Sequence, residues 1–188
     1  MVNKIILASQ SPRRKQLLEW AEVDFEVMVS NSDESYPSNL NFTETAIHIA
    51  QNKALAIVNI YNPEIPVLAA DTIVVCNNEI IGKPINKEDA IEIIKKLSGK
   101  THQVITGVFI KQKEKEISFA DITEVTFNEI TDEQIEFYVE KYKPYDKAGA
   151  YAIQEWIGVV GIQSINGDFY NVMGLPVNRV VKELGALV

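Results

Sequence analysis

Two arginines follow two serines in the stretch "SQSPRRK", where a short apolar run ends and a helix is expected to begin. Cations in a first helical turn are unfavourable, because the helix N-terminus already carries partial positive charge. Free backbone N–H groups, the Ser9 and Ser11 hydroxyls and the guanidinium groups of Arg13 and Arg14 all suit a phosphate. The stretch therefore predicts an anion site. The alternative, a capped helix with both arginines in solvent, is not excluded by this stretch alone.

A carboxylate stands in the middle of the apolar run "VLAADTIVVC", residues 67–76. An ionised group there is costly unless it is paired, hydrogen-bonded or bound to a metal. This position favours Asp71 as the catalytic residue, although a strand-end residue that caps a neighbouring turn would give the same pattern. In a regular strand the next side chain, Thr72, points to the opposite face.

Further candidates carry weaker signals. Lys83 in "GKP" can act as a point charge on phosphate, although the motif is weak alone and a solvated turn lysine is its usual explanation. Gln154 has the paired donor and acceptor that could read a base edge. We expect His102 to be structural and Cys76 to be a core residue.

The elements that must position these residues follow from apolar spacing and from helix and strand breakers. Strands are expected at residues 4–8, 25–29, 67–76, 79–81, 101–112, 117–127 and 158–166. Helices are expected from Pro12, over 43–61, from Asn86 to 97, over 131–142 and from Pro176 to about 185, with a loop over 30–41. This order predicts a mixed α/β protein, with a central sheet flanked by helices and two lobes around a cleft.

Composition limits the class of protein. The length of 188 residues suits one domain over 1–188. The net charge of −8 argues against a nucleic-acid partner. Acidic residues could instead hold a divalent cation that accompanies a phosphate. One cysteine, no apolar run of about 18 residues and no long apolar leader predict a cytoplasmic protein without a membrane partner.

Eight stretches, in order and nearly end to end, resemble the Maf family of nucleoside triphosphate pyrophosphatases. They are "ASQSPRR", "SDES", "AQNKA", "AADTIVV", "GKP", "LSGKTHQVITGV", "DKAGAYAIQ" and "GDFYNVMGLP". Each is weak alone, but eight in register are specific. Asp71-Thr72 together with Gln154 resembles the branch that acts on dTTP and UTP.

The resemblance implies a Maf/ITPase-like fold, a homodimer, and metal-dependent hydrolysis of dTTP, UTP and modified relatives to the monophosphate and pyrophosphate. This activity would clean or limit the nucleotide pool. By position, Asp71 resembles the proton acceptor that activates water and, with Glu34, a ligand for Mg²⁺ or Mn²⁺. The remaining carried-over roles are base preference for Arg13, Thr72 and Gln154, and phosphate binding for Ser9, Arg14, Lys53 and Lys83.

The sequence departs from the family pattern at Ala152 and at Glu155-Trp156, where glycine is common. We expect Trp156 to be able to reshape the base pocket. The resemblance therefore supports the pyrophosphatase reaction more strongly than it supports the preference for pyrimidines. The rival hypothesis is a non-catalytic nucleotide-binding regulator of cell division or septum formation. Asp71 within an apolar strand argues against mere binding.

Overall fold

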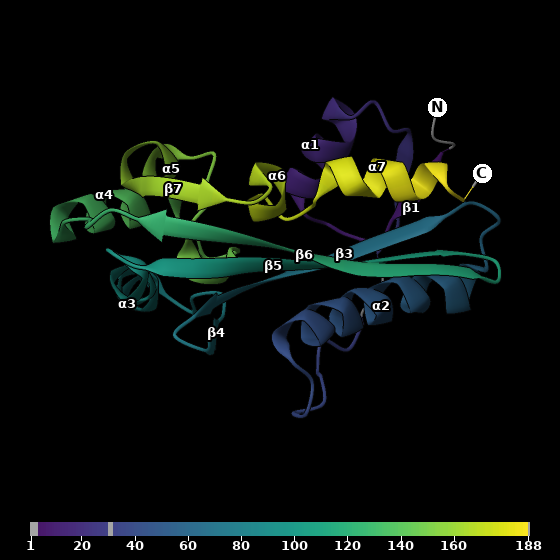
Figure 1. Cartoon of the computed structure of the whole chain (residues 1–188), viewed down its shortest axis with the longest axis horizontal. Coiled ribbons are helices and arrows are strands. Elements are labelled where there is room, and N and C mark those ends of the chain that lie inside the picture. The colour runs from purple at the N-terminus through teal and green to yellow at the C-terminus, as the bar shows by residue number, and fades with distance from the viewer. Residues whose placement is uncertain (1–3, 30–31, 188) are drawn as a thin grey trace. The chain divides into compact units, whose positions relative to one another are not determined.

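The computed structural model describes residues 4–29 and 32–187, which form a seven-stranded sheet with helices (Figure 1). The strand order is β2-β1-β3-β5-β6-β7, with β4 paired to β3. The strands are β1 (Ile5–Leu7), β2 (Phe25–Val27), β3 (Val67–Cys76), β4 (Glu79–Ile81), β5 (Thr101–Gln112), β6 (Lys115–Phe127) and β7 (Ile162–Asn166). The helices are α1 (Pro12–Trp20), α2 (Phe42–Tyr61), α3 (Lys87–Leu97), α4 (Asp132–Tyr142), the 3₁₀ helix η1 (Ala148–Ala150), α5 (Trp156–Gly161), α6 (Phe169–Val172) and α7 (Val177–Gly185).

The chain divides into two compact units. The first comprises residues 1–72, 106–121 and 174–188, and the second comprises residues 73–105 and 122–173. The long strands β3, β5 and β6 each contribute residues to both units. The expected mixed α/β fold with a central sheet flanked by helices is confirmed.

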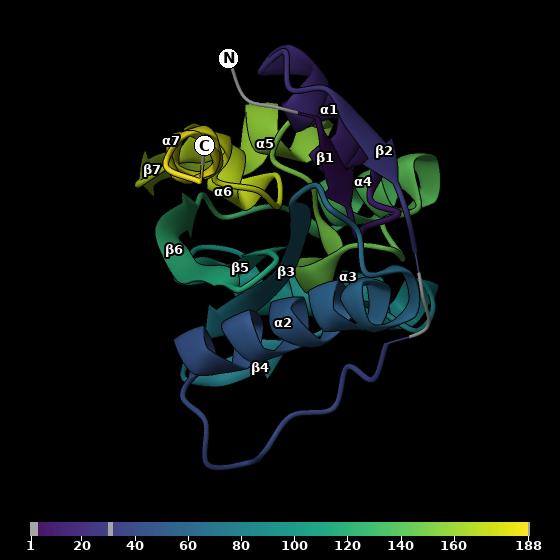
Figure 2. The ribbon, with the colours of Figure 1, turned by 90° about the vertical axis from the view of Figure 1, so that its right-hand side faces the viewer.

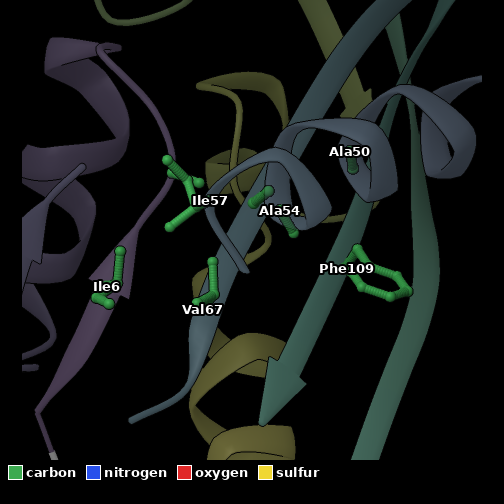
Figure 3. Close-up of a cluster of buried hydrophobic side chains, with 8 residues drawn as sticks. Ile6, Ala50, Ala54, Ile57, Val67 and Phe109 are labelled. Carbon is green, nitrogen blue, oxygen red and sulfur yellow. The ribbon is translucent and has the colours of Figure 1, made fainter. Parts of the chain in front are cut away.

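The first unit is built on parallel pairing of β1 with β2 and of β1 with β3. Helix α2 covers one face of the sheet in this unit, while α1, beside β1 and β2, and α7, beside β6, lie on the other face (Figures 1 and 2). Small and branched side chains fill the space beneath α2 (Figure 3). The buried cluster consists of Ile6, Ala8, Ala50, Ala54, Ile57, Val67, Ala69 and Phe109. The alanines of α2 let the helix lie close to the strands.

Gly107 sets the closest approach of α2 to β5. A Cβ at Gly107 would lie 2.2 Å from the backbone carbon of Ala46, so no larger residue fits without a shift of the helix. The start of α2 is specified locally, because Asn41 and Glu44 form a reciprocal capping box. Asn62 ends the helix in the left-handed conformation at φ 41°.

The second unit places α3 against α4 and extends β6 by antiparallel pairing with β7. Helices α3 and α4 begin where the sequence predicts: Asn86 caps α3, and Thr131 with Gln134 forms the capping box of α4. Asn77 and Asn78 adopt positive φ and turn the chain from β3 into β4. None of the helices within the described residues has the length and apolarity needed to span a membrane.

One predicted strand is wrong in its first half. The expected strand over 158–166 is the helix α5 up to Gly161, followed by β7 from Ile162. A short apolar run has no clear period, so helix and strand cannot be separated from spacing alone. The structure shows that this run starts as a helix: the Glu155 carbonyl accepts hydrogen bonds from the backbone N–H groups of Gly158 and Val159, three and four residues further on.

Candidate active site

The midpoint of β3 presents Asp71 and Thr72 to opposite faces of the strand, as the alternation predicted. Asp71 Oδ1 accepts a hydrogen bond from Lys53 Nζ of α2, at 2.6 Å. Thr72 Oγ1 instead accepts from Arg14 Nη2 of α1, at 3.0 Å, and lies 2.9 Å from Thr106 Oγ1 of β5. The four flanking residues on each side of this pair are buried. The two polar side chains thus take their partners from opposite faces of β3.

Arg14 is buried, with 9% of its surface exposed, and all its bonded nitrogens donate to neutral oxygens. Nε donates to the Gly174 carbonyl at 2.7 Å, Nη1 to Ser9 Oγ at 3.2 Å and Nη2 to Thr72 Oγ1. Within residues 4–29 and 32–187, no carboxylate forms a salt bridge with Arg14. Burial lowers the pKa of Arg14, and the Asp71 charge acts in the opposite direction. A buried cation with neutral partners is a place where an anion would be stabilised.

The solvated alternative is therefore wrong for Arg14. Ser9 is also buried, at 8% exposed, and its hydroxyl accepts from Arg14 and from the Ser11 backbone N–H at 3.2 Å. Arg13 is half-buried and makes no hydrogen bond or ion pair with any described residue. The positive charge of Arg13 lowers the pKa of Arg14. The first turn of α1 contains no acidic residue that would offset these two neighbouring cations.

Lys53 brings the two predicted metal ligands to one point. Its Nζ lies 2.6 Å from Asp71 Oδ1 and 2.8 Å from Glu34 Oε1. The Asp71 side chain is 16% exposed and that of Glu34 is 58% exposed, so the group opens to solvent on the Glu34 side. Two carboxylates thus share one cation, and that cation is an ammonium group.

Two carboxylates at one point offer the hard oxygen donors that divalent cations such as Mg²⁺ take. Among the described residues, no group of three or more His, Cys, Asp or Glu side chains could hold a metal by itself. Mg²⁺ in phosphate-transfer sites is commonly held by one or two carboxylates, with substrate phosphates and water completing its shell. Asp71 and Glu34 supply that number of hard oxygen ligands, and the ammonium group of Lys53 lies between them.

The other two predicted site residues, Lys83 and Gln154, belong to the second unit. Both are exposed, and neither makes a hydrogen bond or ion pair with a residue that the structure describes. Gln154 lies in a turn that precedes α5. His102 and Cys76 are buried, as expected of structural residues, and His102 Nε2 lies 2.7 Å from the Tyr151 hydroxyl.

Sequence reasoning missed two parts of the Arg14 site. Thr106 is fully buried in β5 beside Thr72, and Gly174 offers its carbonyl to Arg14 from a backbone φ of 110°. A polar residue inside the apolar run of β5 was the available signal for Thr106. For Gly174 the only available signal was the presence of a glycine in "VMGLP".

Comparison with known proteins places this chain in a family. A family model described as "Maf-like protein" matches residues 4–187. The chain belongs to the Maf-like protein family. A Maf relative from Phocaeicola vulgatus is 49% identical over 98% of this chain and 96% of its own length. Another, from Cytophaga hutchinsonii, is 51% identical over 96% of this chain and 82% of its own. Both carry the name dTTP/UTP pyrophosphatase. The expected family is thus confirmed.

A solved structure of low sequence identity shares the fold of this Maf chain, and the similarity concerns the fold alone. It is that of a HAM1 protein from Coxiella burnetii, at 15% identity and a TM-score of 0.51 over 98% of this chain and 99% of the other.

Proposed function

We propose that this Maf chain is a metal-dependent pyrophosphatase that hydrolyses dTTP and UTP to the nucleoside monophosphate and pyrophosphate. The observation that carries the proposal is the pair of unlike sites at the middle of β3. One face holds a buried guanidinium with only neutral partners, and the other holds a carboxylate bridged to a second carboxylate by an ammonium. The names of the relatives that match nearly end to end supply the substrate.

The first task of the site is to neutralise a triphosphate. A nucleophile approaches such an anion only when positive groups offset its charge. Arg14 and the Ser9 hydroxyl are proposed to receive phosphate oxygens. Lys53 and Lys83 are proposed to add point charges. Because Arg14 is held by Gly174, Ser9 and Thr72, its guanidinium is oriented before the substrate arrives.

The second task is to take a proton from water. Asp71 is proposed as the proton acceptor, since its carboxylate lies within β3 with most of its surface buried. Lys53 bonds Oδ1 of Asp71 at 2.6 Å, so the proton is proposed to go to the other carboxylate oxygen, Oδ2. Asp71 and Glu34 are proposed to hold Mg²⁺ or Mn²⁺. A bound divalent cation would offset negative charge that develops on the phosphates.

Base preference is proposed to rest on Arg13, Thr72 and Gln154. Arg13 has no described partner, so its guanidinium is available to a ligand. The Thr72 hydroxyl is occupied by Arg14 and Thr106. We therefore assign its influence to the placement of Arg14. Gln154 carries a free amide that can donate and accept on one base edge.

The experiment is a nucleotide panel with Mg²⁺ or Mn²⁺, in which pyrophosphate is scored separately from orthophosphate. We expect pyrophosphate to be released preferentially from dTTP and UTP. Tight nucleotide binding with no pyrophosphate from any member would instead support the non-catalytic regulator, which no observation on the chain favours. Orthophosphate as the first product would place the cleavage at the terminal phosphate and contradict the proposal.

Three further proposals concern the state of the protein. We propose that residues 1–188 form one domain. We also propose that the chain forms a homodimer and that it is located in the cytoplasm. The domain proposal predicts a single cooperative transition in thermal unfolding. The dimer proposal predicts twice the chain mass of 21.1 kDa in light scattering. Fractionation of cells would test the location.

A further inference from the structure

The turn that carries Gln154 is held by one buried tyrosine of α4. The Glu155 backbone N–H donates to the Ala152 carbonyl at 3.1 Å and closes a four-residue turn. Gln154 occupies a corner of this turn and is exposed, whereas Ala150 to Ile153 before it are buried. The side chain proposed to read the base therefore projects from a buried support, and its position depends on what holds the turn.

Tyr138 contacts both ends of that turn through a single hydroxyl group. The Tyr138 hydroxyl accepts from the Ala152 backbone N–H at 3.1 Å and donates to Oε2 of Glu155 in a short hydrogen bond. Its ring is fully buried. Hydrogen bonds linked through one hydroxyl reinforce each other inside a protein. The first and last residues of the turn are thus fixed to the same atom of α4.

Two further contacts hold the same segment. Lys147 Nζ, whose side chain is 11% exposed, lies 3.7 Å from Oε1 of Glu155. The Trp156 ring packs edge-to-face on Phe137 of α4, with ring centroids 4.9 Å apart. The two residues that depart from the family pattern, Glu155 and Trp156, therefore both contact α4. Gly158 adds a close backbone contact, because a Cβ there would lie 1.7 Å from the Ile153 carbonyl oxygen.

We propose that Tyr138 and Glu155 are positioning residues for base recognition, and that their hydrogen bond fixes the turn from which Gln154 reads a pyrimidine. The inference rests on the proposed function and names residues for which that function assigns no role. A fixed turn presents the Gln154 amide in one orientation, so the wrong base leaves its donor or acceptor unpaired. A loose turn lets the amide adapt to several bases. Loss of the Tyr138–Glu155 hydrogen bond, which we call the clamp, thus lowers discrimination between bases more than it lowers turnover.

The test compares kcat/KM for UTP with kcat/KM for GTP in wild type and in four variants. Y138F removes only the hydroxyl and keeps the buried ring. E155A removes the carboxylate, whereas E155Q keeps an oxygen that can accept from Tyr138. Y142F is the matched control: Tyr142 stacks on Tyr138 in the same helix, and its hydroxyl bonds to no described residue. The melting temperature of each variant is recorded alongside.

We expect the UTP/GTP ratio to fall about tenfold in Y138F and in E155A, which corresponds to about 1.4 kcal/mol of discrimination. The ratio should stay within about twofold of wild type in E155Q and Y142F. Two further variants, Q154A and the double variant Y138F/Q154A, should show the same UTP/GTP ratio as each other, since both substitutions act through one amide.

Each outcome has a definite meaning. An unchanged UTP/GTP ratio in Y138F and E155A, in an enzyme that prefers pyrimidines, overturns the inference and leaves the proposed function intact. An equal loss for both nucleotides together with a lower melting temperature also overturns it, because the clamp would then be merely structural. Absence of pyrophosphate from the wild-type protein defeats the proposed function itself. If Y138F does not fold, the comparison of E155A with E155Q decides.

Discussion

Lys53 Nζ lies 2.6 Å from Oδ1 of Asp71, so the carboxylate proposed to accept a proton faces an ammonium group. The same nitrogen reaches Glu34 at 2.8 Å. The pair is partly buried, with 18% of the Lys53 side chain and 16% of the Asp71 side chain exposed. The ammonium offsets the repulsion between two carboxylates that would otherwise face each other. A metal ion at this point must compete with Lys53.

The first prediction concerns that competition. Lys53→Met should strengthen binding of Mn²⁺ in the absence of nucleotide by about tenfold, because the two carboxylates lose their resident cation. Titration of free Mn²⁺ by electron paramagnetic resonance measures this directly. Lys111→Met is the matched control, since Lys111 has the same exposed fraction, 18%, and pairs with Glu116 at 2.6 Å. Equal or weaker Mn²⁺ binding in Lys53→Met would contradict the prediction.

The second prediction concerns the base. Asp71→Asn should lower kcat by about 10²- to 10⁴-fold, the usual contribution of a general base, while nucleotide affinity changes only a few-fold. Steady-state kinetics and a binding titration separate the two effects. Asp33→Asn serves as the control, because the Asp33 side chain is exposed and, among the described residues, is hydrogen-bonded to Ser35 alone. Near-normal turnover in Asp71→Asn would remove Asp71 from the base role.

The third prediction concerns Arg13, whose guanidinium has no described partner. Arg13→Ala should alter the ranking of bases in the nucleotide panel, as expected of a residue that senses the base. Lys15→Ala, two residues further along α1 and also half-buried, should leave the ranking unchanged. A uniform loss across all nucleotides in Arg13→Ala would instead identify a plain phosphate contact.

The fourth prediction is a pH dependence of stability. Burial lowers the pKa of His102 to about 4 from an ordinary value near 6.5. The unfolded chain therefore binds a proton at a higher pH than the native protein does, so His102 lowers stability as pH falls from about 6.5 to 4. This contribution amounts to about 3 kcal/mol across the window. Above pH 6.5 the imidazole is neutral in both states and has no such effect.

Urea unfolding of wild type and His102→Gln at pH 7 and pH 4.5 measures this contribution. Carboxylates titrate in both proteins, so the difference between the two pH slopes isolates His102. Glutamine can retain a hydrogen bond to Tyr151, which keeps the comparison close. Parallel slopes for the two proteins would show that His102 takes up its proton equally in both states.

The fifth prediction concerns the contact between α2 and β5. Gly107→Ala should lower the free energy of unfolding by about 3 kcal/mol, because the new Cβ meets backbone atoms of Ala46 and Ile47 that cannot turn aside. Gly185→Ala at the end of α7 is the matched control, since its Cβ would meet nothing within 4 Å. Equal stability of the two variants in urea unfolding would show that α2 shifts freely.

Much of the fold could be predicted because its signals are local. The Asn86 cap, the Thr131 capping box and the apolar run of β3 each lie within a few residues, and all three were confirmed. Capping bonds and apolar spacing depend on short stretches of chain. The prediction of a strand where α5 lies was wrong because its signal is too short. The run after Trp156 has too few residues for its apolar spacing to separate helix from strand.

The residue types of the site were readable from the sequence by itself, because a carboxylate in an apolar strand and paired arginines after serines are chemically unusual wherever they fold. Only the tertiary structure decided their partners. Arg14 donates to the carbonyl of Gly174, 160 residues away, and Lys53 lies between Glu34 and Asp71. A charge takes its partner from whatever the packing brings within about 3 Å, and that distance is set by helices and strands far apart in the chain.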